Sequence, residues 1–329
     1  MRIGFRPLSQ IPAAAHRRLA GDSFFASPGF LALWTAHDGR PGAWVAEDGG
    51  GPFALLPGVE YGAGAIARFA SVPDDCYGGL RLEADAGRDR VAVAAAVFAA
   101  IVRRRYAKVW VFDFHRTLAA APDGFATVAA ETRLVDISAP GWAPADPGLL
   151  AQARRAGRAG LRVEPFDWDR HAGRFLALVR RAAAQQGRRP RHAPAFYRAL
   201  AALAARDDRV LWRWCEHRGR AVASHIYFVE GGVLQAWQSH HDRAFAALHP
   251  NPHIRLALCR ESAARGIARL NVGATPAGAD GLAAYKARWG GALVRYPTYV
   301  RVGPLGRLAD AVARGRARLR SLSPVRGAC

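Results

Sequence analysis

The chain has 329 residues, of which 51% are hydrophobic and 10% aromatic, so it is longer than one typical domain and can bury large apolar cores. Because only 22% of the residues are charged, the composition excludes a disordered chain. The formal net charge of +21 predicts a positive surface and an anionic partner, such as nucleic acid, anionic lipid or a phosphorylated substrate.

The N-terminal segment lacks the pattern of a secretory leader, because Pro7 and Pro12 interrupt it before an apolar stretch forms. The longest apolar run, residues 91–102, is shorter than the ~20 residues that cross a bilayer. We therefore expect a soluble, cytoplasmic protein, with peripheral contact to an anionic membrane left open. The cysteines show no spacing typical of zinc sites or a disulfide framework, so we expect neither a metal nor a disulfide: Cys76, Cys215, Cys259 and Cys329.

The first half of the chain alternates helical and extended patterns. Ser27 and Pro28 precede an apolar stripe and predict a helix start, since Ser caps helices and Pro suits the first helical position. Residues 90–105 predict a second helix. The aromatic run from Lys108 to Phe114 predicts a buried strand, on whose one face Asp113 and His115 would contribute to an acceptor site. Further extended segments are expected at residues 43–47, 52–56, 66–72, 77–80 and 125–137.

Residues 138–147 contain three prolines and a glycine and carry no periodic pattern. A domain boundary is predicted here, between an N-terminal domain of residues 1–140 and a C-terminal domain of residues 147–329.

The second half predicts a helix capped by Asp146, then a strand, two amphipathic helices and an antiparallel meander whose strands are joined by short glycine turns. A helix, a strand, a short helix and a last strand follow, before an Arg-rich tail. The expected ranges are 147–160, 161–166, 174–186, 194–206, 210–216, 221–229, 233–239, 253–265, 267–272, 281–289, 292–302 and 307–320.

This order of elements is the order of the acyl-CoA N-acyltransferase (GNAT) fold, and the first half follows it more loosely. The predicted class is α/β with a mixed sheet, as tandem GNAT-like domains. Several motifs stand out along this order: the basic helix and strand of residues 152–164, WQSHHD at 237–242, NVG at 271–273, YKARWG at 285–290 and the YGG loop at 77–79. With these motifs the second half resembles the Fem-type branch of that superfamily, which includes peptidoglycan-bridge aminoacyltransferases.

The resemblance implies transfer of an aminoacyl or acyl group to an amine of a small-molecule or peptide acceptor. Lys286 is the main catalytic candidate, because it is one of two lysines in a chain whose other 45 basic residues (47 − 2) are arginines. Leu282, Tyr285 and Trp289 are predicted to form the buried stripe of its helix, with Lys286 on the flank facing a cleft. A solvated lysine is the alternative.

His225 lies in the second strand of the meander, and His240 and His241 end the third. Imidazole titrates near pH 7, so a histidine here can accept the proton of an attacking amine, with a structural histidine as the alternative. Asp242 is a candidate to orient such a histidine, to bind a substrate ammonium or simply to begin a turn. Trp237 is predicted as either a wall of the substrate site or a core residue.

Asn271 and Gly273 mark a strand end, where an amide can bind substrate and glycine allows close backbone approach, or where the chain merely turns. Tyr285 and Tyr77 complete the predicted substrate-binding set.

The donor is the second question. A CoA-binding GNAT protein holds the pyrophosphate on a glycine-rich loop before a helix, but residues 241–252 contain no glycine. Aminoacyl-tRNA is therefore the expected donor, with tRNA and not DNA as the nucleic acid partner, no bound cofactor, and a CoA thioester as the alternative donor.

Arginines supply the predicted tRNA surface. Arg154, Arg155 and Arg158 share one helix and Arg162 follows it, as a phosphate-binding surface or as a solvated basic face. The alternating arginines of the tail suggest a diffuse electrostatic arm for RNA or anionic lipid: Arg314, Arg316, Arg318 and Arg320. Two rival functions stay open, a CoA-dependent N-acyltransferase and a non-catalytic GNAT-like module that binds RNA or membrane.

Overall fold

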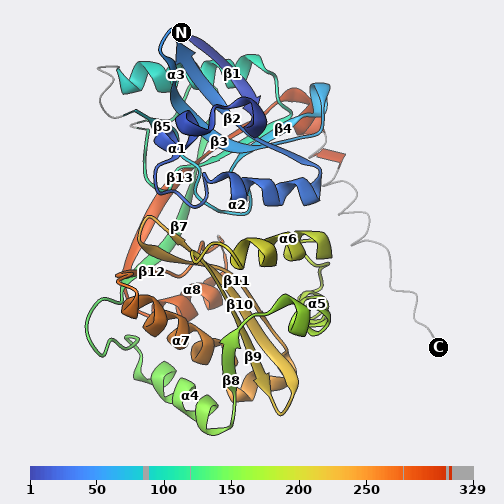
Figure 1. The fold of residues 1–329 in the computed structure, drawn as a ribbon, viewed down its shortest axis with the longest axis vertical. Helices are drawn as coiled ribbons and strands as arrows, with labels where there is room; N and C mark the ends of the chain where they lie inside the picture. The colour runs from blue at the N-terminus through green and yellow to red at the C-terminus, as the bar shows by residue number, and fades with distance from the viewer. Residues whose placement is uncertain (84–88, 119, 277, 309–310, 313–329) are drawn as a thin grey trace, which may run out of the picture. The chain divides into compact units, whose positions relative to one another are not determined.

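The computed structural model describes residues 1–83, 89–118, 120–276, 278–308 and 311–312, which form a mixed α/β protein (Figure 1). The described residues fall into two compact units, each made of segments that are separate in the sequence. Unit 1 comprises residues 1–21, 38–128 and the described residues from Pro297 onward; unit 2 comprises residues 22–37 and 129–296. The tail arginines predicted as an electrostatic arm lie outside the described residues.

Unit 1 is a sheet with helices packed on it. Its strands lie in the order β1-β2-β3-β4-β6-β13, with β5 pairing β3, and all neighbours are antiparallel except β4 and β6. The helix α3 connects these two parallel strands, as a crossover requires. The elements are β1 (Arg2–Pro7), a 3-10 turn (Leu8–Gln10), α1 (Ala13–Ala20), β2 (Gly39–Asp48), β3 (Gly51–Tyr61), a 3-10 turn (Gly64–Ile66), β4 (Arg68–Ser71), β5 (Arg81–Leu82), α3 (Arg90–Arg103), β6 (Lys108–Phe112) and the second half of β13 (Ala292–Val302).

Alternation along β2 explains how the sheet of unit 1 is covered on both faces. Trp44 packs in the core that contains Val97 and Ile101 of α3. Ala43 and Val45 point to the other face and pack with residues of and before α1. The sequence did not predict β1 or α1.

Unit 2 contains the meander. Its strands lie in the order β7-β12-β11-β10-β9-β8, with β11 and β12 parallel and the other neighbours antiparallel. The elements are α2 (Pro28–Ala32), a 3-10 turn (Leu33–His37), β7 (Ala126–Asp136), α4 (Pro147–Arg158), β8 (Arg162–Pro165), α5 (Trp168–Ala184), α6 (Pro194–Ala204), β9 (Val210–His217), β10 (Arg220–Glu230), β11 (Val233–His241), a 3-10 turn η4 (Arg243–Leu248), α7 (Pro250–Ala264), β12 (Arg269–Asn271) and α8 (Asp280–Ala287).

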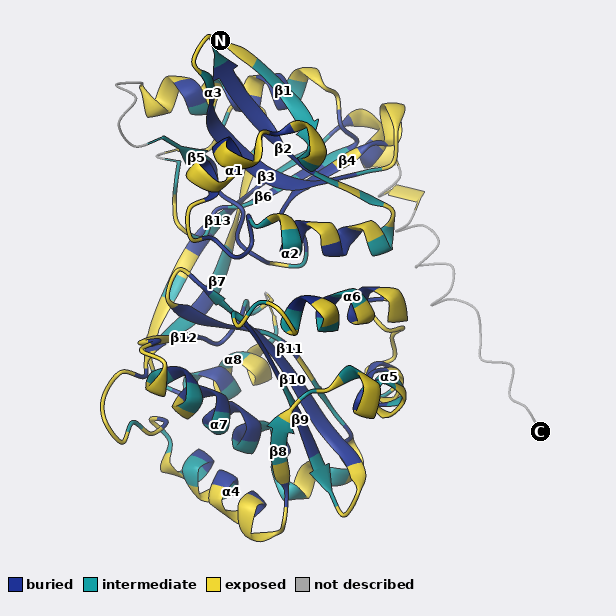
Figure 2. Cartoon of the chain, viewed as in Figure 1, coloured by how far each residue is buried: buried dark blue, intermediate teal, exposed yellow. Residues whose placement is uncertain are grey.

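The strands β9, β10 and β11 are largely buried (Figure 2), because helices cover both faces of their sheet. Leu149 of α4 and Ile254 of α7 belong to a core with Leu211 and Tyr227 of the strands. Phe175 of α5 and other aromatic rings pack on the opposite face. α5 begins at Trp168, earlier than predicted, because the Asp167 side chain accepts a hydrogen bond from the Arg170 amide and caps the helix.

The units differ from the predicted ranges 1–140 and 147–329 in three segments, of which residues 129–140 belong to unit 2. Residues 22–37 belong to unit 2, where Phe24, Phe25 and Phe30 lie within 5.1–5.8 Å of the Phe228 ring. Residues 298–302 of β13 pair with β6 in unit 1. No described helix is long and apolar enough to span a lipid bilayer.

Candidate functional site

The parallel strands β11 and β12 share a short ladder in unit 2. Their register ends at Gln235 opposite Asn271, whereas β11 itself continues to His241. A β-bulge at Trp237 interrupts the pairing of β11 with β10, because Ala236 faces Tyr227 and Gln238 faces the preceding Ile226. Bulges often redirect side chains next to active sites. This end of the β11–β12 ladder is the centre of the candidate site.

Lys286 is buried beside the loop that follows β12. Its side chain is 6% exposed, and Nζ donates hydrogen bonds to the carbonyl oxygens of Gly273 (2.8 Å) and Ala274 (2.7 Å) and to Oγ1 of Thr275 (3.2 Å). An ammonium group has three N–H donors, so these contacts occupy all of them. In this structure Lys286 therefore holds the loop of residues 273–275 in place.

The prediction for the helix around Lys286 was partly wrong. Leu282 is 41% exposed and does not join a buried stripe, whereas Lys286 is the buried residue of α8. Trp289 is buried as predicted, and Tyr285 packs half-buried against the core. The inner face of this short helix is taken by the aliphatic stem of Lys286, which spans from α8 to the loop.

Asn271 and Gly273 shape the same loop. The Asn271 side-chain oxygen accepts hydrogen bonds from Oγ1 of Thr132 (2.6 Å) and from the Gly273 amide (2.9 Å). Gly273 has φ +85°, and a Cβ there would lie 2.9 Å from the Ala236 carbonyl oxygen. Thus glycine is needed for the loop to pass beside β11, and the Asn271 oxygen serves the turn.

Arg255 of α7 is a second buried cation near Tyr285, and sequence reasoning missed it. It is 6% exposed; its Nε donates to the Tyr227 hydroxyl (2.7 Å), and its guanidinium carbon lies 5.1–6.0 Å from the ring centroids of Tyr227, Tyr285 and Trp289. Within the described residues it has no carboxylate partner, and three enclosed polar atoms lack hydrogen bonds: Arg255 Nη1, Tyr285 Oη and Trp289 Nε1. No sequence signal distinguished Arg255 from the other arginines.

The predicted histidines are poor bases in this environment. Nε2 of His225 donates to the Asn251 side-chain oxygen (3.0 Å), whose amide group donates to Nδ1 of His241 (3.2 Å). His240 contacts Gln238 at 3.0 Å. Burial lowers the pKa of both His225 and His240 to about 3, and it also lowers the pKa of His241. Both His225 and His240 are therefore neutral and weakly basic at neutral pH.

Trp237 lies in the last part of β11, and Asp242 follows directly after the strand. Both side chains contact other parts of the protein and so help to hold its structure. The Trp237 ring stacks on His192 at 5.4 Å. Asp242 is buried, caps the 3-10 turn η4 by accepting from the Ala244 amide (3.1 Å), and pairs with Arg181 (3.2 Å). It does not contact the histidines through any described hydrogen bond.

The first-half residues predicted for an acceptor site do not share a strand face. β6 ends at Phe112, and Asp113 is buried in the following turn, where it accepts hydrogen bonds from Thr117 and Leu118. His115 is exposed. The prediction was wrong because an Asx-type turn ends the strand at this point. Tyr77 is buried and stacks on Phe114 at 4.0 Å.

The basic surface predicted for tRNA is present as exposed side chains of unit 2. Arg154, Arg155 and Arg158 lie on α4 and Arg162 on β8, all four exposed. Within the described part of the chain they make no hydrogen bond or ion pair, so their charges are available to a polyanion.

The N-terminus of α7 offers few amide groups to a phosphate. Helix N-termini bind anions through their free N–H groups. Here Pro250 and Pro252 have no N–H, and the amide of the capping residue His249 donates to the Ala246 carbonyl (3.0 Å). Of these first four positions only the Asn251 amide is left for a ligand.

One cluster in unit 2 has the composition of a metal site. Possible ligand atoms of Glu164, His171 and Glu216 lie within 4.8 Å of one another. However, Arg170 pairs with Glu164 (3.7 Å) and Arg174 with Glu216 (2.6 Å), so guanidinium groups already neutralise both carboxylates. We assign no metal to this cluster.

Comparisons with known proteins bear on the fold of the chain. Residues 149–287 match the family model of the acetyltransferase (GNAT) domain. Solved structures with a similar fold include that of FemX, with TM-score 0.64 and 11% identity over 95% of this chain and 100% of that chain. Another is the C-terminal domain of a putative lysylphosphatidylglycerol synthetase from Agrobacterium fabrum, with TM-score 0.59 and 15% identity over 92% and 96%. L-PGS from Bacillus licheniformis has TM-score 0.54 and 14% identity over 86% and 90%.

At these identities the structural likeness concerns the fold, and no curated protein matches the sequence. The mixed α/β fold and the resemblance to the Fem-type branch are confirmed at that level.

Proposed function

We propose that the chain transfers an aminoacyl group from aminoacyl-tRNA to an amine of a small-molecule or peptide acceptor, on the premise that residues 149–287 match the model of the acetyltransferase (GNAT) domain. The observation that carries the choice of donor is the N-terminus of α7, where Pro250 and Pro252 remove two of the N–H groups that would hold a CoA pyrophosphate. A tRNA donor needs no such cradle, because its phosphates can be bound elsewhere on the surface.

The arginines of α4 support a polyanionic donor. Arg154, Arg155 and Arg158 present three charges on one exposed helix, and the whole chain carries +21. Binding of this kind releases counterions from the nucleic acid and weakens steeply as salt is added.

In the proposed reaction, the acceptor nitrogen attacks the ester carbonyl carbon of the aminoacyl-tRNA. An amide bond forms, the ester C–O bond breaks, and the terminal ribose oxygen leaves with the proton that the amine loses. Since His225 and His240 are weak bases, we propose that this proton passes to the leaving oxygen directly or through water.

Lys286 acts in this scheme as a positioning residue. It fixes the loop of residues 273–275 beside Ala236, and its charge, with that of Arg255, favours negative charge developing on the carbonyl oxygen in a site of low dielectric. No direct contact of Nζ with substrate is needed.

The test measures tRNA binding and aminoacyl discharge with the full chain. We expect binding of mixed aminoacyl-tRNA that falls with salt, and release of the labelled amino acid from tRNA when amine acceptors are supplied. The double substitution Arg155→Gln, Arg158→Gln is expected to reduce the slope of log K against log salt by roughly 1.5, at ~0.7–0.9 per phosphate contact.

The control replaces two exposed arginines near α6, Arg198→Gln and Arg206→Gln, and so has the same net charge. If both double variants lose tRNA affinity to the same extent, the arginines of α4 do not form a specific tRNA-binding surface. Thermal stabilisation by CoA, with thiol release from an acyl-CoA and none of the tRNA effects, would establish the CoA-dependent alternative instead.

A further inference from the structure

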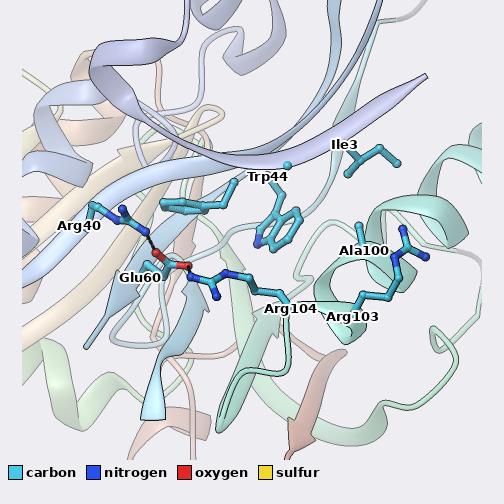
Figure 3. A pocket seen from close by; sticks show the side chains of 9 residues that line it. Ile3, Arg40, Trp44, Glu60, Ala100, Arg103 and Arg104 are labelled. Carbon is cyan, nitrogen blue, oxygen red and sulfur yellow. Dashed lines mark hydrogen bonds and ion pairs between the residues drawn. The ribbon is translucent and has the colours of Figure 1, made fainter. Parts of the chain in front are cut away.

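Unit 1 contains an open pocket between α3 and the sheet edge formed by β1 and β2. All residues that line it belong to the described part of the chain. Its volume is about 420 Å³, within the range of small-molecule sites. One wall is apolar and includes Ile3, Trp44 and Ala100 (Figure 3). Phe5 and Gly4 also line the pocket, and the other lining residues are charged.

A buried carboxylate organises the charged side of the pocket. Glu60 is 2% exposed, pairs with Arg40 and lies 3.8 Å from Arg104 (Figure 3). It also accepts a hydrogen bond from the Tyr106 hydroxyl. Burial raises the pKa of Tyr106 to about 12, so its hydroxyl remains a donor at neutral pH. Glu60 is thereby paired with two arginines and one hydroxyl, and it holds two guanidinium groups beside the pocket.

One arginine of the pocket has no acceptor among the described residues. Arg103 lines the pocket from the last turn of α3 and, in the described part of the chain, makes no hydrogen bond or ion pair. Trp44 is 4% exposed and contributes its ring to the apolar wall, with its Nε1 enclosed beside the Tyr106 hydroxyl. Arg103 is exposed, so an anion in the pocket can reach its guanidinium group.

Charge and shape then select the ligand. Three arginines against one glutamate leave a formal +2 (3 − 1) around a pocket with an aromatic wall. Such a site excludes ammonium ligands and favours a group that brings only acceptors and carries negative charge. We propose that this pocket binds a small organic oxyanion, a phosphomonoester or a carboxylate with an aromatic or apolar body. The ring would lie against Phe5 and Trp44, and the anion would bind Arg103 and the two arginines held by Glu60.

This proposal does not depend on the donor assigned above, because it concerns residues of unit 1 only. Its test uses binding of defined probes to the full chain, measured by calorimetry and by thermal shift. Phenyl phosphate and benzoate carry both features, inorganic phosphate only the charge, and benzyl alcohol only the ring. We expect at least one of the first two to bind roughly tenfold or more tightly than the last two.

Two variants locate the binding. Arg103→Gln is expected to weaken the bound probe roughly tenfold, since it removes a charge-assisted contact. Trp44→Leu, which removes the aromatic ring of the wall and keeps an apolar side chain, is expected to weaken it several-fold. The matched control is Arg90→Gln, an exposed arginine at the other end of α3.

Preference for phenyl phosphate over benzoate would identify the phosphomonoester as the ligand class, and the reverse would identify the carboxylate. Binding no stronger than that of inorganic phosphate, or equal weakening by Arg103→Gln and Arg90→Gln, would overturn the proposal.

Discussion

Replacing Lys286 with methionine tests how the loop after β12 is held. Methionine preserves much of the length of the side chain but donates no hydrogen bonds. The Gly273 carbonyl still lies 2.8 Å from Oγ1 of Thr132, which shares its single proton with the Asn271 oxygen, whereas the Ala274 carbonyl loses the donor described for it. The substitution therefore leaves one partly buried carbonyl unsatisfied.

The magnitude follows from these contacts. Hydrogen bonds from a charged donor contribute about 1.5–3 kcal/mol each, and an unsatisfied buried carbonyl costs about 1–3 kcal/mol. Part of this loss is offset because methionine need not be stripped of water on folding. We expect Lys286→Met to lower the free energy of unfolding by about 2–4 kcal/mol, and to reduce transfer roughly hundredfold through misplacement of the loop.

Equilibrium unfolding in urea, followed by tryptophan fluorescence, measures the first effect, and discharge of aminoacyl-tRNA measures the second. The control is Lys108→Met, at the other lysine of the chain, whose Nζ lies 4.9 Å from the Trp110 ring; it should cost about 1 kcal/mol. If Lys286→Met unfolds within about 0.5 kcal/mol of the unaltered protein, Nζ does not hold the loop and the reasoning fails.

Three other predictions follow from buried groups. First, the unfolded chain takes up protons on His225 and His240 below pH ~6.5, whereas the folded protein keeps both side chains neutral because burial lowers their pKa to about 3. The free energy of unfolding is therefore highest above pH ~6.5 and decreases as pH falls, by about 4 kcal/mol for the pair at pH ~5. Urea titrations that give the same free energy at pH 7 and pH 5 would contradict this. Second, Glu230→Ala removes the carboxylate that accepts hydrogen bonds from the Ser23 hydroxyl (2.7 Å) and the Phe25 amide (3.1 Å). It should lower the free energy of unfolding by about 2–4 kcal/mol and speed proteolysis at residues 22–37. An unchanged cleavage rate would show that Glu230 does not hold this segment. Third, Gly273→Ala should lower stability by about 1–3 kcal/mol and impair transfer, because of the positive φ and the nearby Ala236 carbonyl; wild-type values in both assays would rule out the described loop conformation.

The sequence predicted the second half well because its signals are local. Asp146 caps α4 through its side chain, Pro147 begins the helix, and short glycine turns separate the strands of the meander. These features determine whether a segment forms a helix or a strand, and they can be recognised without knowing its tertiary contacts. The first strand, β1, was missed because it is short and ends at Pro7, so alternation over a few residues was its only signal.

The candidate site was less accessible to sequence reasoning, since it depends on contacts between distant segments. Lys286 was singled out correctly as unusual, but its side chain does not face a cleft as predicted. It points to carbonyl groups of the loop at residues 273–275, and no sequence pattern reveals the path of that loop. Arg255 was missed because burial, and not residue type, distinguishes it. The histidines were judged by the ordinary pKa of imidazole, which burial overrides.

The exchange of segments between the two units has a practical consequence for dividing the gene. A cut in the proline-rich stretch at 138–147 would deprive the C-terminal half of Phe24, Phe25 and Phe30, which cover Phe228, and would leave the N-terminal half without the closing strand that pairs with β6. Each fragment would expose a freshly opened apolar surface or an unprotected sheet edge, the features that drive aggregation. The two recombinant halves should therefore both be soluble only when they are co-expressed. Grafting residues 22–37 back onto the second half should make that half soluble by itself.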